Sequence, residues 1–441
     1  MKSIQSVVSS VPALRNALID RDSVYTYRNL YDIKDKNTEA IQFLSGQNVV
    51  INGRSRIEFA ILLFLLDGNA RSILFLPTDI DNSLHQRYYD EANINFEVYL
   101  HDGILKYNVV NSVKCKENTL STQWIIPTSG TTNIPKLVSH TFESLTRTAK
   151  INIEKGENFR WGLVFDIYRF SGIQVFLQSL LSGSTLIMTD PSQSMSDMLT
   201  LLAKNHTNAL SATPSFWRKV LMTKESDMLN FERITLGGEI ADNNILQALK
   251  QKYPKAKIVH IYASTEVGVG FSVSDGKEGF PVSYLNGELD SIEMKIDDNG
   301  LLWISPPDKN QKYLSDAPMY DTEGYINTGD LVKVSNDRVL FLGRESGAIN
   351  VGGNKVQPEE VETVLMNSGL ISAAYVFAMK NPMMGSLVCA DVVLKDEIDK
   401  KEAKKILLSY CREHLEGFKV PAIVKFVNTI ETTQSGKLKR Q

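Results

Sequence analysis

Short apolar runs alternate with longer amphipathic segments through the first part of the chain. Residues 49–51 and 72–76 are apolar runs that predict strands, and residues 55–66 between them predict a buried helix. A helix that connects two strands of one sheet brings the second strand parallel to the first. We therefore expect a parallel sheet near the N-terminus.

The same alternation continues to about residue 262. The expected strands are residues 124–126, 163–165, 185–188, 209–212, 233–236 and 257–262, and the expected helices are residues 141–155, 172–181, 195–204, 214–222 and 242–252. Strands separated by helices over this length predict an α/β fold, with layered parallel or mixed sheets flanked by helices.

The pattern changes near residue 290, where short turns such as Asp298-Asn-Gly300 favour antiparallel pairing. The expected strands there are residues 291–297, 301–305, 331–334 and 339–342. They are followed by a hairpin (348–356), a helix (359–366), two strands, a second helix (399–414) and a last strand (422–427). We therefore expect a large α/β domain over residues 1–342 and a small α+β domain over residues 343–441.

The composition is typical of a soluble globular protein, with 43% hydrophobic and 22% charged residues, and 441 residues are enough for two or three domains. A net charge of −3 gives no general attraction to nucleic acid or to an anionic membrane. The longest apolar run, residues 59–66, is far shorter than the roughly 20 residues of a membrane-spanning helix, and the N-terminus lacks the apolar segment of a signal peptide. We expect a cytoplasmic protein with no nucleic-acid partner and no membrane span.

Cysteine and histidine residues show no ligand spacing. Cys115, Cys389 and Cys411 are widely separated and odd in number, so they suggest neither a disulfide framework nor a zinc site. The six histidines are expected to be ordinary surface or core residues. No structural metal is expected.

The stretch Thr128-Ser-Gly-Thr-Thr-Asn-Ile-Pro-Lys136 is a candidate phosphate-binding loop. Its hydroxyl side chains, its glycine and its closing lysine offer donors to a polyphosphate. A Walker A loop needs a second glycine and a hydroxyl after the lysine, but this chain has Pro135 and Leu137 at those positions. The alternative is an ordinary polar turn between two elements.

Four further stretches combine functional side chains. Tyr262-Ala-Ser-Thr-Glu266 joins an aromatic ring to hydroxyls and a carboxylate, which suit a stacked base and a cation. Asn327-Thr-Gly-Asp330 presents a carboxylate that suits a vicinal diol. Residues 343–353 couple an arginine to a glycine-rich connection, and Ser435-Gly-Lys437 places a lysine on the C-terminal tail.

In this order, the five stretches resemble the motifs of the adenylate-forming superfamily, which includes acyl- and aryl-CoA synthetases, peptide-synthetase adenylation domains and firefly luciferase. The resemblance begins with Ala17-Leu-Ile-Asp20 and Tyr25-Thr-Tyr27 and extends to Lys437, nearly the whole chain. One hydroxyl-rich loop is weak evidence, whereas five motifs in family order, with the small domain last, are specific.

The resemblance implies a role for each matching residue. The β- and γ-phosphates of ATP would be held by Thr128, Ser129, Gly130, Thr131, Thr132 and Lys136, and the adenine would be framed by Gly237, Gly238, Glu239, Tyr262 and Ala263. Asp330 would bind the ribose with help from Arg344. The catalytic residues would be Thr265 at the α-phosphate, Glu266 on Mg²⁺, and Lys437 between the substrate carboxylate and the α-phosphate. The acyl pocket would be lined by Tyr168, Arg169, Gly237 and Ser264.

In this family the small domain swings after adenylation, and the acyl group then passes to a thiol. The resemblance places the hinge at Ser346, beside Gly347, which permits a large backbone rotation. Gly352 and Gly353 would lie beside the path of the incoming thiol. The acceptor would be CoA or the phosphopantetheine arm of a carrier protein.

Five positions depart from the family pattern, among them the hinge, where Ser346 stands in place of the acidic residue of most relatives. Asn133 and Ala263 replace glycines, and neither change removes a charged group. Arg169 replaces a common histidine, and we hypothesise that it contacts an acidic or polar substrate tail; the alternative is a salt-bridged arginine at the pocket rim. Phe170 stands where adenylation domains hold the substrate amine with an aspartate, which disfavours an α-amino acid.

We therefore predict an ATP- and Mg²⁺-dependent ligase that converts a small carboxylic acid to an acyl-adenylate and transfers the acyl group to CoA or to a carrier protein. One alternative is an adenylating enzyme with a non-thiol acceptor, such as an amine. Another is a nucleotide-binding homologue without turnover. The retained charges argue against it, because a retired site has no physical reason to keep them: Lys136, Glu266, Asp330, Arg344 and Lys437.

Overall fold

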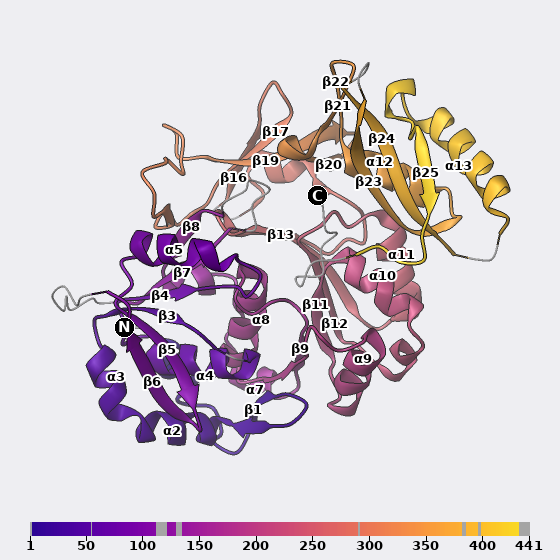
Figure 1. Cartoon of the computed structure of the whole chain (residues 1–441). Helices are drawn as coiled ribbons and strands as arrows, with labels where there is room; N and C mark the ends of the chain where they lie inside the picture. The colour runs from indigo at the N-terminus through magenta and orange to yellow at the C-terminus, as the bar shows by residue number, and fades with distance from the viewer. Residues whose placement is uncertain are drawn as a thin grey trace.

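The computed structural model describes residues 2–53, 55–111, 121–128, 135–289, 292–381, 385–395 and 398–431. Figure 1 shows a large N-terminal part, with a smaller unit of strands and helices at the C-terminal end of the chain. Among the described residues, every helix is too short or too polar to cross a membrane.

The first large sheet confirms the predicted parallel unit near the N-terminus. Within the described residues it contains, in spatial order, β18 (Lys312–Tyr313), β8 (Leu137–His140), β7 (Gln123–Pro127), β4 (Ser72–Phe75), β3 (Asn48–Ile51), β5 (Phe96–His101) and β6 (Ile104–Val109). Strands β3, β4, β5 and β7 run parallel. The helix α4 (Arg56–Leu66) connects β3 to β4, and Ser55 caps it by accepting the Glu58 N–H.

The second large sheet carries most of the predicted alternation. Its described strands are, in spatial order, β14 (Gly268–Val273), β13 (Lys257–Ser264), β12 (Arg233–Gly237), β11 (Ala209–Ala212), β9 (Arg160–Leu163), β10 (Thr185–Met188), β1 (Asn16–Ile19) and β2 (Val24–Thr26). The pairs from β1 to β13 are parallel, and only the outer strands β2 and β14 pair antiparallel. The connecting helices are α8 (Phe170–Leu181), α9 (Met195–Lys204), α10 (Pro214–Met222) and α11 (Asn243–Lys252).

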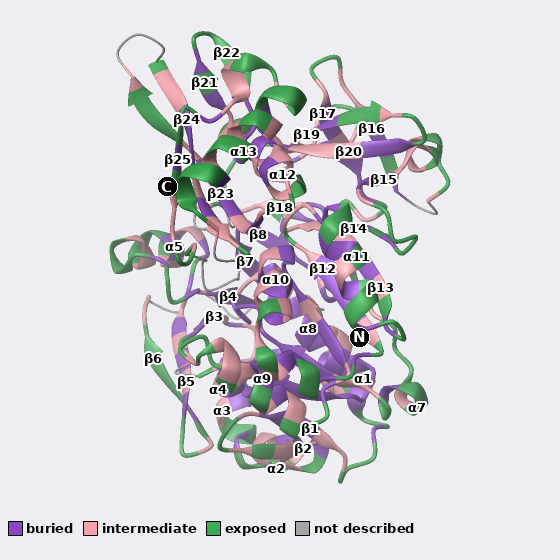
Figure 2. Cartoon of the chain, turned by 90° about the vertical axis from the view of Figure 1, so that its right-hand side faces the viewer, coloured by how far each residue is buried: buried purple, intermediate pink, exposed green. Residues whose placement is uncertain are grey.

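The two sheets share a hydrophobic core that contains α4 and α8. Ile73 and Phe75 of β4 join this core, while Leu74 between them packs on the other face with Tyr88 of α5 (His85–Glu91). Burial on both faces explains why these strands are continuous apolar runs. Figure 2 shows buried strands through the middle of the molecule, and the helices α1 (Ile4–Val8), α2 (Tyr27–Lys36) and α3 (Thr38–Leu44) complete the N-terminal layer.

Beyond residue 279 the sheets are mainly antiparallel, as predicted. One contains, in order, β15 (Phe280–Pro281), β20 (Arg338–Arg344), β19 (Ile326–Ser335), β17 (Leu301–Ser305) and β16 (Glu293–Ile296). The last contains β22 (Asn354–Val356), β21 (Ile349–Val351), β24 (Gly385–Leu394) and β23 (Ile371–Asn381), with β25 (Ile423–Phe426) paired to β24. With α12 (Pro358–Asn367) and α13 (Lys400–His414), this sheet encloses a core of its own, whereas a boundary at residues 342 and 343 stays a prediction.

Four local predictions were wrong. The helix expected over residues 141–155 is two short helices, α6 (Phe142–Thr146) and α7 (Ile153–Gly156), because the β-branched Thr146, Thr148 and Ile151 favour helix poorly and Asn152 caps a new helix. Strand β8 was missed, and it pairs antiparallel with β7. The strand expected at residues 163–165 is β9, which ends at Leu163. Strand β19 is longer than expected and includes Asn327 to Asp330.

Candidate nucleotide and acyl site

The carboxyl ends of β12 and β13 bring the predicted adenine-framing residues together. The two strands are parallel, and Gly237 pairs with Ile261 at their ends. Gly238 has a φ of +81°, which suits glycine in the turn that leaves β12. In open α/β sheets, ligands bind beyond the carboxyl ends of such strands.

The carboxylate of Glu239 faces a helix end. Its Oε2 accepts the Ser215 N–H at 2.9 Å, in the first turn of α10. The N-terminus of a helix favours a negative charge. The helix end therefore stabilises the negative charge of Glu239. The predicted contact between Glu239 and adenine stays a prediction.

Asp330 is held between two partners at the meeting point of β13, β19 and β20. The Tyr262 hydroxyl donates to Asp330 Oδ2 at 2.6 Å, and Arg344 Nε lies 3.0 Å from Oδ1. Asp330 and Arg344 are directly opposite each other on β19 and β20. Each carboxylate oxygen has a second lone pair, so Asp330 can still accept hydrogen bonds from two hydroxyls.

The surroundings fix the charge states of these partners. Burial, together with the charge of Asp330, raises the pKa of Tyr262 well above its ordinary value, so the phenol stays a neutral donor. Burial alone would lower the pKa of Arg344, but the interactions with Asp330, Tyr262 and Glu266 together outweigh it and raise the pKa. The Tyr262 ring stacks between Phe271 and Phe341, at centroid distances of 5.2 and 5.4 Å. Tyr262 and Arg344 therefore hold Asp330 in place. The three residues together carry one negative charge, on Asp330, and one positive charge, on Arg344.

Thr265 and Glu266 follow in the turn from β13 to β14. Ser264 Oγ accepts the Val267 N–H at 3.0 Å and closes this turn. Thr265 is buried and Glu266 is half-buried. Mg²⁺ is usually bound by one or two carboxylates together with substrate phosphates, so Glu266 fits a metal that arrives with a nucleotide. No group of three or more metal-binding side chains exists among the described residues.

The candidate phosphate loop joins two antiparallel strands. Its ends are fastened by the Thr128 N–H, which donates to the Lys136 carbonyl at 2.8 Å, and by the Lys136 N–H, which donates to Thr128 Oγ1 at 3.1 Å. The predicted phosphate ligands Ser129, Gly130, Thr131 and Thr132, and the predicted catalytic Lys437, lie outside the described residues. Their roles stay predictions.

A tyrosine that the sequence did not single out lies beside Lys136. Lys136 Nζ is 4.5 Å from the centroid of the Tyr313 ring. Burial and the charge of Glu266 raise the pKa of Tyr313 to about 12. Lys136 of the candidate phosphate loop therefore contacts a ring from the distant strand β18.

Comparison with known proteins decides the family. The model of the AMP-binding enzyme family matches residues 80–303, just over half of the chain. The model of the AMP-binding enzyme C-terminal domain matches residues 360–437. The chain belongs to the AMP-binding enzyme family. The predicted adenylate-forming superfamily is thereby confirmed.

Individual relatives are distant in sequence, but the matches extend over most of this chain. A D-alanine–D-alanyl carrier protein ligase of Bacillus cereus (strain Q1) is 26% identical over 410 residues, which are 86% of this chain and 78% of that protein. A 2-succinylbenzoate–CoA ligase of Listeria monocytogenes serotype 4b (strain F2365) is 25% identical over 325 residues, which are 72% of this chain and 68% of that protein.

Solved structures share the fold. The o-succinylbenzoate CoA synthetase of Bacillus subtilis, solved with its acyl-adenylate, has a TM-score of 0.73 at 20% identity and covers 99% of this chain and 97% of its own. An anthranilate CoA ligase solved with anthranoyl-AMP has a TM-score of 0.80 at 17% identity. The match covers 99% of this chain and 95% of that protein. They confirm the predicted fold class.

In this AMP-binding enzyme, Arg169 is already salt-bridged. Its Nη2 lies 2.7 Å from Asp79 Oδ1, and its Nε lies 3.7 Å from Oδ2 of the buried Asp166. Burial raises the pKa of Asp166, and both the Tyr168 N–H and the Arg169 charge oppose that shift. The Tyr168 hydroxyl donates to the Gly53 carbonyl at 2.7 Å. These contacts agree with the alternative interpretation, a salt-bridged arginine at the pocket rim. A contact between Arg169 and the substrate stays a prediction.

His140 is a second feature that sequence reasoning missed. It ends β8, is fully buried, and has its ring 5.7 Å from that of Phe170. Its Nδ1 lies 3.4 Å from Ser144 Oγ, while Nε2 has no hydrogen-bond partner among the described residues. Burial lowers the pKa of His140 to about 4, and the nearby backbone of Thr265 offsets part of this shift. A neutral imidazole therefore lies between the phosphate-loop strand and the acyl-pocket segment.

The predicted hinge and thiol-path residues lie where β20 leads into the C-terminal sheet. Ser346 is in a short 3-10 turn, Glu345–Gly347, and Gly352 and Gly353 form the exposed turn from β21 to β22. Gly343 has a φ of +140°, which L side chains rarely adopt, and a Cβ there would also force the Glu359 carboxylate to move. The hinge and thiol roles stay predictions.

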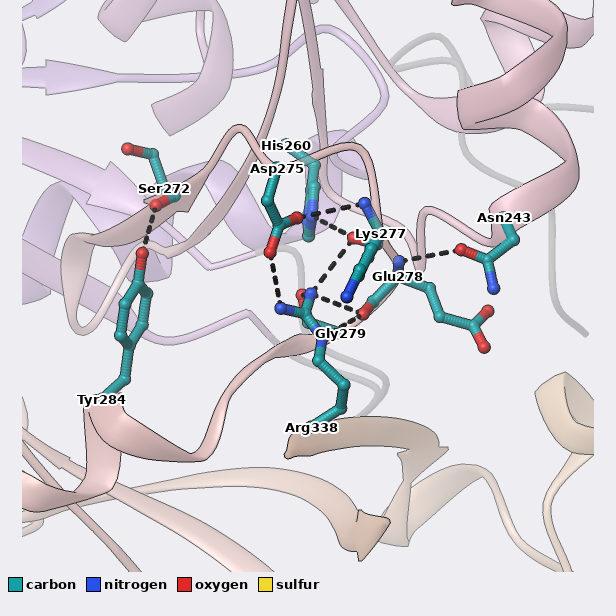
Figure 3. A network of polar contacts seen from close by, with 9 residues as sticks. All are labelled: Asn243, His260, Ser272, Asp275, Lys277, Glu278, Gly279, Tyr284 and Arg338. Atoms are coloured by element: carbon teal, nitrogen blue, oxygen red, sulfur yellow. Dashed lines mark hydrogen bonds and ion pairs between the residues drawn. The ribbon is translucent and has the colours of Figure 1, made fainter. Parts of the chain in front are cut away.

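A buried arginine fixes the other end of β20. Arg338 donates to Asp275 Oδ2 at 2.7 Å, to the Glu278 carbonyl at 2.7 and 3.0 Å, and to the Gly279 carbonyl at 2.9 Å. Figure 3 shows these residues gathered around the arginine. His260 of β13 also contacts this connection, at the Lys277 carbonyl. The cluster ties the connection from β14 to β15 onto the strand that carries Arg344.

Proposed function

We propose that this AMP-binding enzyme is an ATP- and Mg²⁺-dependent carboxylic acid:thiol ligase. It activates a small carboxylic acid as an acyl-adenylate, releases pyrophosphate, and passes the acyl group to CoA or to the phosphopantetheine arm of a carrier protein. The observation that carries the proposal is the Asp330 carboxylate, which Tyr262 and Arg344 hold at the strand ends with acceptor capacity to spare.

The mechanism is mainly positioning and charge compensation. A carboxylate that attacks the α-phosphate must overcome repulsion between two anions. Asp330 holds the ribose, Thr265 contacts the α-phosphate, and Lys136 holds the departing phosphates in line. Lys437 reduces the repulsion at the attacking carboxylate, and Glu266 would hold Mg²⁺, which would supply Lewis-acid stabilisation of the pyrophosphate.

The acid is proposed to lack an α-amino group, although one relative is named for D-alanine. Phe170 is buried and apolar, so it cannot pair with an ammonium. The nearby carboxylate of Asp166 already faces Arg169. Because the relatives are named for a carrier protein and for CoA, both acceptor classes belong to the proposal.

The test is acid-dependent ATP/pyrophosphate exchange with short, medium, long, hydroxylated and aromatic acids and with amino acids. We expect exchange with at least one acid, and loss of exchange in Lys437→Ala but not in Lys425→Ala, which removes an exposed lysine of β25. Exchange with no acid would favour the nucleotide-binding homologue. Exchange without thioester formation would favour a non-thiol acceptor.

The same panel tests Arg169. If Arg169 contacts an acidic substrate tail, Arg169→Ala will shift the preference away from dicarboxylic acids. An unchanged preference would leave Arg169 as the salt-bridged partner of Asp79 and Asp166.

A further inference from the structure

Tyr313 reaches the candidate nucleotide site from a distant part of the chain. Strand β18 adds to the edge of the first sheet beside β8, where Tyr313 pairs with Val138 and the Leu314 N–H donates to the Leu137 carbonyl at 3.0 Å. This pairing sets the register of Tyr313 against the strand that begins directly after Lys136. The tyrosine is therefore fixed in place by backbone hydrogen bonds.

The ring face contacts the lysine of the candidate phosphate loop. Lys136 Nζ lies 4.5 Å from the ring centroid, a distance at which the ring face attracts a cation. The Tyr313 ring therefore gives the Lys136 ammonium a defined position.

Lys136 is exposed, and an exposed lysine side chain loses rotamer freedom when it binds a ligand. The aromatic face restricts the ammonium before a polyphosphate arrives, which lowers this cost.

We propose that Tyr313 is a positioning residue that holds the Lys136 ammonium in place at the candidate phosphate loop, so that less side-chain freedom is lost when a polyphosphate binds. This inference rests on the proposed function. It adds a residue that touches neither the reacting carboxylate nor the α-phosphate.

The test is the dissociation constant of Mg·ATP, measured by calorimetry on the full chain, together with KM for ATP and kcat in the exchange assay. Tyr313→Leu is expected to weaken Mg·ATP binding about two- to thirtyfold, the range of a cation–π contact, and to raise KM more than it lowers kcat. Tyr313→Phe keeps the ring and should stay within about twofold of the wild type. In a double-mutant cycle, Tyr313→Leu should have little further effect in a Lys136→Ala background.

Tyr325→Leu is the matched control. Its ring lies 4.2 Å from Lys295 Nζ, a similar contact outside the candidate site, so its loss should leave Mg·ATP affinity unchanged. Unchanged affinity in Tyr313→Leu, additive effects with Lys136→Ala, or an equal loss in Tyr325→Leu would overturn the inference. A wild-type chain that binds no Mg·ATP would instead refute the proposed function.

Discussion

Two arginines at opposite ends of β20 show how this chain separates architecture from chemistry. The Arg338 side chain is 10% exposed, and its three nitrogens donate to one carboxylate and to backbone carbonyls. The Arg344 side chain is 47% exposed, and its Nε lies 3.0 Å from Asp330 Oδ1. Each nitrogen of Arg338 already donates a hydrogen bond, so this arginine is a structural clamp. Arg344 is exposed and can donate hydrogen bonds to a ligand.

The largest expected effect is on the clamp. Arg338→Ala would leave several buried carbonyls without donors, and we expect a loss of about 3–5 kcal/mol in the free energy of unfolding. Arg338→Lys should recover only part of it, because an ammonium cannot reproduce the guanidinium fork. Thermal and urea unfolding measure both. Loss of ATP binding at unchanged stability would show that Arg338 belongs to the nucleotide site. It would contradict the structural role that distinguishes Arg338 from Arg344.

Asp330 should behave in the opposite way. Asp330→Ala is expected to weaken ATP binding about 100-fold, roughly the value of two hydrogen bonds to a charged group, while stability falls by only about 1 kcal/mol, the cost of leaving the Tyr262 hydroxyl without its acceptor. Asp275→Ala, which removes the carboxylate partner of Arg338, is the matched control and should lower stability without changing ATP affinity. Equal effects of the two substitutions on affinity would contradict the distinction.

His140 lies between these extremes, because it is buried but incompletely partnered. Its folded pKa of about 4 is below the ordinary 6.5, so between pH 6.5 and 4 the unfolded chain binds more protons. Stability is therefore fully present above pH 6.5 and falls with the pH through this window, by about 2 kcal/mol from pH 6.5 to 5. His140→Gln removes this contribution, so unfolding curves of the two proteins should converge as the pH falls. A constant difference would contradict a neutral imidazole.

The smallest expected effect is at Arg344 itself. Arg344→Ala removes a half-exposed charge beside Asp330, and we expect KM for ATP to rise about five- to tenfold, near 1 kcal/mol, with no change in melting temperature. A measurable loss of stability would make Arg344 a second clamp rather than a ligand-binding group.

Most of the layered fold could be predicted because β3, β4 and α4 are apolar runs whose length and period are visible in the sequence. The motif residues Asp330 and Arg344 could be named, but their pairing depends on the register of β19 and β20, which no local pattern shows. Tyr313 lies in a two-residue strand without any period, and it meets β8 only through tertiary pairing. The burial of His140 likewise depends on packing against α8 rather than on spacing.

The most direct measurement is acid-dependent ATP/pyrophosphate exchange in wild type and Asp330→Ala, with the folded fraction determined on the same samples. The result we predict is exchange in the wild type with at least one carboxylic acid, and loss of at least 99% of the rate in the fully folded variant, as about 3 kcal/mol of lost nucleotide binding requires at subsaturating ATP. A folded Asp330→Ala protein that exchanges at the wild-type rate would contradict the assignment of this site.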